Sequence, residues 1–348
     1  MEGYVWRISS EMASMGHRVE VLCESLLAPE APPGVQVHQL GRMAPKPRWL
    51  SHLRFSKRVH RWLCENNDAH RIIHSHERTA DHHITTFHGP PFAIILDKPW
   101  YQRLGLRIQA NLWLEKREVC GEQVRAVVPN SILIRESLQK RYPCIGKKLT
   151  APVIPGVDES IPVRPERHLP AEAGTVGFVS KEWKRKGLNL AIDIVERMSR
   201  DRPELEFVVA GPDPEEVRPL FADRSFRYRL LGQTDARPLF AGFDLLLHPA
   251  GIEPFGMVIT EALSARVPVV ASDQCGATTE VDPDRILSLD ASPEQWSECA
   301  LAALGRPQPP YRHSWTTVAE AYIRLYRNLP FELTCGSQVD SITRAAGL

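Results

Sequence analysis

The sequence contains no segment typical of a secretion signal or a membrane anchor. Its first residues, MEGYVWRISSEMASMG, lack the apolar stretch of a signal peptide, and no run of about 18 apolar residues could form a transmembrane helix. An excess of charge is also absent, because 43 basic and 42 acidic residues give a formal net charge of +1. We therefore expect a cytoplasmic protein without global attraction to nucleic acid or membranes, so that any such attraction must be local.

Paired cysteines are missing as well. The seven cysteines are odd in number, scattered along the chain and never spaced as Cys-x-x-Cys: Cys23, Cys64, Cys120, Cys144, Cys275, Cys299 and Cys335. This pattern favours reduced thiols in a cytoplasm over a disulfide framework.

Short apolar runs alternate with longer segments of helical period. The runs that we expect to be strands are 19–23, 71–75, 84–88, 125–129, 175–180, 206–210, 227–231, 244–248 and 267–271. The segments that we expect to be helices are 4–15, 49–65, 102–120, 131–141, 187–200, 256–265, 294–304 and 315–328. Strands that are apolar along their whole length and joined by helices predict parallel sheets covered on both faces.

The length of 348 residues suits two domains. A connection rich in Pro and Gly, APVIPGV at 151–157, predicts a linker between a first domain, 1–150, and a second, 151–314. We expect an α/β fold of two doubly wound, Rossmann-like domains that face each other across a cleft. A ligand should bind there, at the carboxyl ends of the strands. The tail, 334–348, is expected to be disordered.

The most informative stretch is 248–272, HPAGIEPFGMVITEALSARVPVVAS. It predicts a strand, a turn at Glu253–Gly256, and a helix whose first amides, at Gly256, Met257 and Val258, have no partner inside the helix. Such a helix start binds phosphate, and glycine lets the backbone approach a ligand closely. Carboxylates are poor partners for phosphate but good acceptors for sugar hydroxyls. Glu253 and Glu261 flanking a phosphate site therefore predict a nucleoside-diphosphate sugar.

A basic segment, KEWKRKGL at 181–188, follows the strand 175–180 and precedes a helix. It would face the same end of the cleft, where Arg185 and Lys186 could neutralise the diphosphate and the charge that develops on a leaving group. A solvated basic turn is the alternative interpretation, and it is the better one if this segment is considered alone.

These motifs resemble those of retaining GT-B glycosyltransferases of family 4, including the hexosyltransferases of the lipopolysaccharide core. The resemblance rests on EPFG…EAL at 253–263, PVVAS at 268–272, RKGL at 185–188, PNS at 129–131 and PGVD at 155–158. It implies that Glu261 holds the donor ribose, that Glu253 holds the donor hexose, and that the backbone of Phe255, Gly256, Met257 and Val258 contacts hexose and phosphate. It also implies diphosphate binding by Arg185 and Lys186, retention of anomeric configuration, no cofactor and no metal, and a last helix, 315–330, that crosses back to the first domain.

Six of the thirteen histidines lie between 70 and 88. A metal site is the alternative, but no helical His-x3-His pair or neighbouring cysteine ligand is present, so we expect no metal and interpret these histidines as lining the cleft or exposed. The resemblance implies that His88 approaches the donor sugar and that His76, Glu77 and Arg78 line the acceptor side. The connection from 76 to 84 is short for a parallel crossover, which predicts a hairpin or an edge strand.

Two features depart from the family. The strand that usually comes before the first helix is missing, so either the coding start lies upstream of Met1, which we favour, or the sheet has an unfilled position. Gly3 would then remain from the acceptor-side loop. Arg266 stands where the family usually has Gly, and a left-handed conformation there would cost about 1 kcal/mol.

A basic surface is expected in the first domain. Residues 31–64 contain no Asp or Glu but seven cations, at 42, 46, 48, 54, 57, 58 and 61. Together with KPWYQR at 98–103, the segment 42–63 could lie on an anionic membrane surface. The alternative is a helix whose apolar face packs on the sheet, and the two interpretations are compatible. No nucleic-acid-binding motif is present.

The sequence therefore predicts a retaining, metal-independent glycosyltransferase at the inner face of the cytoplasmic membrane. It would move a hexose from a donor such as UDP-glucose to a glycolipid, lipopolysaccharide-core or other cell-envelope glycan. The catalytic candidates are Glu253, His88, Lys186 and Arg185. Two alternatives remain open: a nucleotide-sugar 2-epimerase of the same architecture, and a non-catalytic, degenerate glycosyltransferase that acts as a binding protein.

Overall fold

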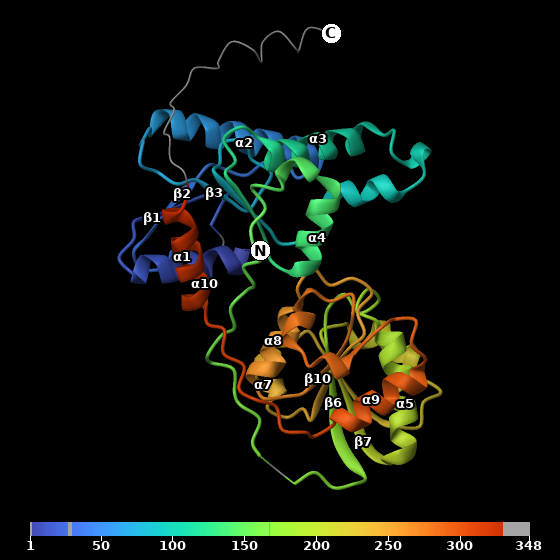
Figure 1. Ribbon diagram of the computed structural model, residues 1–348. Helices are drawn as coiled ribbons and strands as arrows, with labels where there is room; N and C mark the ends of the chain where they lie inside the picture. The colour runs from blue at the N-terminus through green and yellow to red at the C-terminus, as the bar shows by residue number, and fades with distance from the viewer. Residues whose placement is uncertain (1, 27–29, 167, 330–348) are drawn as a thin grey trace.

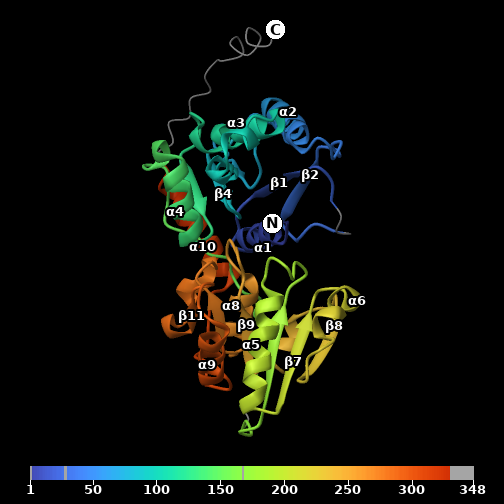
Figure 2. The same ribbon diagram turned by 90° about the vertical axis from the view of Figure 1, so that its right-hand side faces the viewer.

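Two α/β domains lie one above the other in the computed structural model, which describes residues 2–26, 30–166 and 168–329 (Figure 1). The N-terminal domain is at the top of the view and the C-terminal domain at the bottom. The expected tail, 334–348, lies outside the described residues. After a quarter turn, α1 and α4 are again seen on the side of the N-terminal domain that is nearest the C-terminal domain (Figure 2).

The N-terminal domain holds five parallel strands in two separate sheets. Its elements in chain order are α1 (Glu2–Ser14), β1 (Val19–Cys23), β2 (Val35–Gln39), α2 (Arg48–Glu65), β3 (His74–Ser75), β4 (Ile84–Phe87), η1 (Phe92–Asp97), η2 (Trp100–Gln102), α3 (Leu106–Cys120), β5 (Ala126–Pro129), α4 (Ile132–Arg141) and η3 (Pro143–Ile145). One sheet is β1-β2 and the other is β3-β4-β5. No strand within the described ranges joins the two sheets, and α1 comes before the first strand.

The C-terminal domain is built on one six-stranded parallel sheet in the order β11-β10-β9-β6-β7-β8. Its elements are β6 (Ala173–Val179), α5 (Leu188–Asp201), β7 (Glu204–Ala210), α6 (Pro214–Val217), η4 (Arg218–Phe221), β8 (Arg227–Gly232), α7 (Arg237–Phe240), β9 (Leu245–His248), α8 (Met257–Ser264), β10 (Val269–Ser272), η5 (Gly276–Glu280), η6 (Pro283–Arg285), β11 (Ile286–Leu287) and α9 (Pro293–Ala303).

Burial on both faces of this sheet explains its apolar strands. All four residues of β9 and of β10 are buried, as expected for parallel strands covered by helices on each side. On one face, α5 and α9 pack side by side and enclose Trp296, which is fully buried. On the other face, α8 contributes Ile259 and Leu263, four positions apart and therefore on one side of the helix.

The last helix, α10 (Trp315–Arg327), packs on the N-terminal domain although it follows the C-terminal domain in sequence. Ser314 caps it by accepting a hydrogen bond from the amide of Thr317. Its fully buried Tyr322 shares one apolar cluster with Tyr4 of α1, and the two hydroxyls are 2.9 Å apart. The chain therefore crosses between the two domains a second time, immediately before Trp315.

Most expected elements are confirmed, with boundary shifts of a few residues. The hairpin predicted between 76 and 84 is wrong, because β3 pairs with β4 in parallel; β3 is nevertheless an edge strand of its sheet. The sequence analysis missed β2, the two-residue β11, and the one-turn helices α6 and α7. The left-handed conformation anticipated at Arg266 is present, with φ of 60°.

None of the helices in the described part of the chain is long and apolar enough to cross a membrane. The cysteines found at described positions all carry free thiols. Among them, the Sγ atoms of Cys120 and Cys144 are 2.9 Å apart.

Candidate functional site

The candidate site lies beside β6, where the chain stops adding strands on one side of the C-terminal sheet and continues on the other. Strand β6 is flanked by β7 on one side and by β9 on the other, so the chain progresses toward both edges of the sheet from β6. In open α/β sheets, ligands bind outside the carboxyl ends of the two strands at such a point. The loops that leave those ends are the basic segment after β6 and the Glu253–Gly256 turn after β9, so the two motifs singled out in the sequence meet here.

The turn after β9 opens helix α8 in the expected way. Gly256 caps the helix with φ of 102°, a conformation that side-chain-bearing residues rarely adopt. A Cβ at this position would lie 3.0 Å from Cγ of Glu253 and 3.1 Å from Ile259, so glycine is also required for space. Met257 and Val258 provide first-turn amides, which have no partner inside the helix. Phe255 is buried and anchors the turn to the core below α8.

Lys186 and Glu253 form an ion pair beside this helix start, and both side chains are largely buried. Burial, followed by the nearby cation of Arg185, lowers the pKa of Lys186 to about 8, whereas the contact with Glu253 favours the charged form. The next residue, Gly187, caps α5 with φ of 77°, and a Cβ there would lie 2.1 Å from the carbonyl oxygen of Pro249. Glycine therefore lets the loop after β6 lie directly against the loop after β9.

Arg185 reaches across the same pair of loops. Its guanidinium donates to the carbonyl oxygen of Ile252 and pairs with Glu182, while its own carbonyl oxygen accepts from the amide of Gly251 at 3.0 Å. Arg185 also lines a hollow of about 540 Å³ that lies against the start of α5. Arg185 is partly exposed, so its charge remains available to an anionic ligand.

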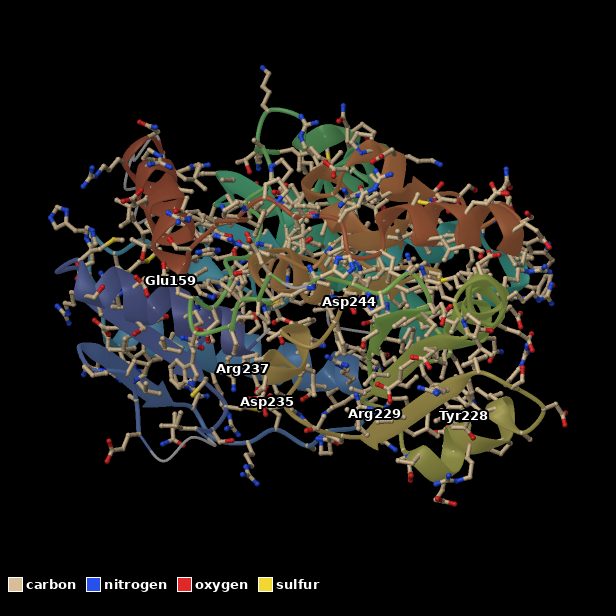
Figure 3. All side chains as sticks on the ribbon, turned by 90° about the horizontal axis from the view of Figure 1, so that it is seen from below. Glu159, Tyr228, Arg229, Asp235, Arg237 and Asp244 are labelled. Atoms are coloured by element: carbon tan, nitrogen blue, oxygen red, sulfur yellow. The ribbon has the colours of Figure 1, made fainter. Side chains whose placement is uncertain are left out.

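Glu261 lies one turn into α8 and is half-buried. Burial raises the pKa of Glu261, and the nearby cation of Arg237 opposes this shift. Arg237 lies at the start of α7 beside Asp235, with which it pairs (Figure 3). Its Nη1 is also 3.7 Å from Oδ2 of Asp158. Sequence analysis did not identify Arg237, because nothing in the local pattern places the short α7 next to α8.

The N-terminal domain contributes His88, at the end of β4. Its Nε2 lies 2.9 Å from Nδ1 of His76, the two rings stack at 27°, and the ring of Tyr4 packs edge-on at 4.6 Å. Burial lowers the pKa of His88 to about 4 and that of His76 to well below its usual value. Both imidazoles are therefore neutral at physiological pH, and one ring donates a hydrogen bond that the other accepts.

A hydrogen bond joins the N-terminal domain to the turn that opens α8, the candidate phosphate site. Asn130 donates to the backbone oxygen of His88 at 3.3 Å, and the next residue, Ser131, donates from Oγ to the carbonyl oxygen of Pro254 at 2.7 Å. The PNS and EPFG motifs, 123 positions apart in sequence, are thus in contact. Their contact holds His88 and the start of α8 on facing sides of the domain boundary.

The predicted acceptor-side residues do not form one cluster. Gly3 lies in the first turn of α1, and its Cα faces open space. Arg78 is directed into its own domain, where it pairs with the buried Glu115 at 3.3 Å. Glu77 is partly exposed, and its Oε2 lies 3.5 Å from Nδ1 of His52. Only His76 of the predicted segment, 76–78, is in contact with His88.

The histidine-rich stretch is a hydrogen-bond network. His74 lies between two hydroxyls, with Nδ1 2.7 Å from Tyr326 and Nε2 2.7 Å from Thr86. His82 lies 2.9 Å from the carbonyl oxygen of Glu118. Within the described residues, no group of three or more His, Cys, Asp or Glu side chains is arranged to hold a metal ion.

Besides Arg237, a second residue of the site was not recognised in the sequence. His248, at the end of β9, is fully buried, and its Nε2 lies 3.5 Å from Oε2 of Glu253. In the sequence it looks like the last residue of an apolar strand followed by proline. The signal that could have found it is a polar residue at the carboxyl end of a strand at the switch point.

Comparisons with known protein families agree with this architecture. Residues 1–160 match the family model described as Glycosyltransferase Family 4, and residues 173–305 match the model described as Glycosyl transferases group 1. Together the two models account for most of the chain. The protein belongs to the family 4 glycosyltransferases of the GT-B fold.

Individual relatives are distant. The lipopolysaccharide glucosyltransferase WaaG of Escherichia coli K12 is 31% identical over 152 residues, 41% of this chain and 40% of WaaG. The phosphatidyl-myo-inositol mannosyltransferase of Mycobacterium leprae is 25% identical over 97% of this chain and 95% of its own length.

Two solved structures share the fold over nearly the whole chain. The crystal structure of WaaG has a TM-score of 0.71 at 20% identity and covers 93% of this chain and 91% of its own. The structure of Anabaena Alr3699/HepE in complex with UDP-glucose has a TM-score of 0.63 at 17% identity and covers 94% of this chain and 96% of its own.

Proposed function

We propose that this glycosyltransferase moves a hexose from a nucleotide-diphosphate sugar, such as UDP-glucose, to a glycolipid or lipopolysaccharide-type acceptor. One observation carries the proposal. The loops after β6 and β9 bring Arg185, Lys186 and Glu253 together at the start of α8, the helix that carries Glu261, at the switch point between β6 and β9. That set matches the chemistry of a sugar diphosphate, whose phosphates need donors and cations and whose hydroxyls need acceptors.

Each group has a role in this proposal. The first-turn amides of α8, together with Arg185 and Lys186, bind the diphosphate and stabilise the charge that develops as it leaves. Glu261 binds the ribose, and Glu253 binds the hexose. His88 approaches the hexose from the opposite domain as a neutral hydrogen-bonding group, because burial holds its pKa at about 4.

We infer retention of anomeric configuration without a metal ion. The cations of Arg185 and Lys186 would provide the charge compensation that a divalent metal provides in other phosphoryl-leaving reactions. In the retaining mechanism implied by the family resemblance, the leaving phosphate accepts the proton of the acceptor hydroxyl. The neutral His88 is not required as a base in that scheme, which agrees with its lowered pKa.

The proposal of a membrane-linked acceptor is based on the names of two relatives and on one surface of the N-terminal domain. WaaG is named as a lipopolysaccharide glucosyltransferase, and the M. leprae relative as a phosphatidyl-myo-inositol mannosyltransferase. Both names describe acceptors that are membrane components. On that basis we propose that His76 and Glu77 lie on the path of a lipid-linked acceptor, and that the enzyme works at the inner face of the cytoplasmic membrane.

The surface that would contact the membrane projects from the side of the N-terminal domain (Figure 1). Its exposed apolar side chains are Ile94, Leu96, Trp100, Tyr101, Leu104, Leu106 and Trp113. We call it the 94–113 surface; it also carries the cations Lys98, Arg103 and Arg107. An exposed apolar patch with cations is typical of a protein that rests on anionic lipid.

Helix α2 is built differently from the 94–113 surface. Val59 is buried, and the ring of Trp62 packs at a tilt of 48° against His38 of β2 and lies beneath the guanidinium of Arg71. The apolar side of α2 therefore packs on its own domain, as the alternative interpretation of this segment expected. The exposed cations of α2 can still add attraction to an anionic membrane.

The test is turnover with a panel of labelled nucleotide sugars and a lipopolysaccharide-core or glycolipid acceptor. We expect transfer of a hexose with retained configuration, observed by the anomeric coupling in the product. Glu253→Gln and Lys186→Ala should abolish transfer while the melting temperature stays within a few degrees of the wild type. Arg229→Ala, an exposed change on β8, is the control. Unchanged turnover in both site variants would contradict the site, and epimerisation of the donor without acceptor would contradict the reaction.

A further inference from the structure

An unpaired buried imidazole lies next to the Lys186–Glu253 ion pair. His248 has no exposed surface, and within the described residues neither ring nitrogen has a hydrogen-bond partner. Buried polar groups are nearly always paired, so an exception calls for an explanation in terms of function. Oε2 of Glu253 lies 3.5 Å from Nε2 of the ring, which is slightly too far for a good hydrogen bond.

The charged groups that face this imidazole determine its protonation. Burial lowers the pKa of His248 to about 3, and the cations of Lys186 and Arg185 act in the same direction. Although Glu253 is close, the ring is therefore neutral at physiological pH and carries one N–H and one lone pair. A neutral ring can donate a hydrogen bond to a carboxylate without adding a buried charge.

Lys186 already contacts the carboxylate oxygen that His248 faces. In the proposed function, Lys186 serves the diphosphate and Glu253 serves the hexose hydroxyls. When Lys186 turns toward a phosphate, the largely buried carboxylate of Glu253 loses its strongest partner. Such a carboxylate needs another donor to stay ionised and oriented. The N–H of His248 is the closest candidate, and a shift of about half an ångström brings it into hydrogen-bond range.

We propose that His248 is a positioning residue for Glu253. It donates from Nε2 to the carboxylate and holds it toward the hexose while Lys186 is engaged with the diphosphate. The ring is completely buried, so it does not touch the substrate itself. The inference rests on the proposed function and adds to it a residue that acts through Glu253.

The test is a matched pair of substitutions at this position. His248→Gln keeps a donor at nearly the same reach, whereas His248→Met has almost the same shape and no donor. We expect kcat/KM for the donor to stay within about threefold of the wild type in His248→Gln and to fall by about tenfold to a hundredfold in His248→Met. The melting temperature of the Met variant should equal or exceed that of the Gln variant, because Met removes an unpaired buried polar group.

A merely structural role for His248 would not separate the two variants by activity. Equal kcat/KM in His248→Gln and His248→Met, with both folded, would overturn the proposal. If the Met variant does not fold, the smaller pair His248→Asn and His248→Leu makes the same comparison. Wild-type donor binding and turnover are measured first: their absence refutes the proposed function, whereas normal wild-type turnover with equal variants refutes only the role of His248.

Discussion

Ser131 and Pro254 are joined by a hydrogen bond that crosses the two domains: Oγ of Ser131 donates to the carbonyl oxygen of Pro254 at 2.7 Å. The same Oγ accepts from the amide of Ile134 and so caps α4. One hydroxyl thus fixes the start of a helix in the N-terminal domain and the loop that opens α8 in the C-terminal domain. Gly276 lies at this junction: a Cβ there would be 2.0 Å from the Pro254 oxygen and 2.7 Å from Ser131 Oγ.

Gly276→Ala should therefore disturb both the domain contact and the phosphate-site candidate. The added methyl group cannot fit without moving the backbone of Pro254, so we expect destabilisation of about 1–3 kcal/mol and a clear rise in donor KM. Thermal unfolding and steady-state kinetics measure the two effects. Gly105→Ala, where the new Cβ meets open space, is the control. A Gly276→Ala protein as stable and active as the control would show that the contact is not tight.

Glu118 gives a pH-dependent prediction. This carboxyl is buried on α3 and accepts from Oγ1 of Thr85, and burial raises its pKa from 4.5 to about 7. Because the folded protein favours the protonated form of Glu118, this carboxyl contributes fully to stability below about pH 4.5. The contribution is lost as the pH rises toward 7. Glu118→Gln cannot ionise, so its stability relative to the wild type should increase from pH 5 to pH 8, by at most about 3 kcal/mol.

Melting temperatures of the two proteins at pH 5, 6, 7 and 8 measure this difference. His82, whose pKa burial lowers to about 4, destabilises both proteins alike as the pH falls below 6.5, so its effect cancels. Glu122→Gln, an exposed change two residues after the end of α3, is the control and should show no pH-dependent difference. A constant offset for Glu118→Gln at every pH would refute the raised pKa.

Arg266 is the one described non-glycine residue with a positive φ, at 60°. Its amide bonds to the carbonyl oxygen of Leu263, and the amide of Val267 bonds to that of Ala262, which closes the end of α8. Arg266→Gly removes the strain of a left-handed side-chain-bearing residue but adds freedom to the unfolded chain, so we expect a net gain of about 0.5 kcal/mol. Arg266→Lys retains the Cβ and should be neutral. A Gly variant less stable than the Lys variant would contradict this account.

The 94–113 surface predicts binding to anionic vesicles. Trp100 is 68% exposed and Tyr101 is 62% exposed, so replacing both by Ser should weaken co-sedimentation with phosphatidylglycerol vesicles without affecting the fold. Lys98→Gln with Arg103→Gln should reduce binding to the anionic vesicles and make it less sensitive to salt. Val163→Ser, at another exposed apolar position, is the control. Equal binding of all variants would place the membrane contact elsewhere.

Local sequence patterns were sufficient for most of the fold. Strand β9 and helix α8 could be predicted because an apolar run, a glycine turn and a helical period follow one another within 20 residues or so. Strand β2, VQVHQ, was missed because it is polar at alternate positions and depends on its pairing with β1. The hairpin expected between β3 and β4 was wrong because a loop without a helix joins these two parallel strands.

The candidate site was predictable only in part, for a physical reason. Glu253, Glu261 and Lys186 lie in segments whose spacing indicates their chemistry. Arg237 and His248 could not be predicted in this way, because the position of α7 beside α8 and the burial of the His248 ring follow from packing. For the same reason, the sequence did not indicate that Arg78 would pair with Glu115 instead of facing the acceptor side.

The most direct test of the central claim is calorimetric titration of the protein with a panel of nucleotide-diphosphate sugars, UDP-glucose first. The account predicts saturable binding of at least one member without added metal. Glu261→Gln and Arg185→Met should weaken binding by about tenfold or more, and Arg229→Met on β8 should leave it unchanged. Equal binding by the wild type and both site variants would contradict the claim that the start of α8 and its flanking charges hold the sugar diphosphate.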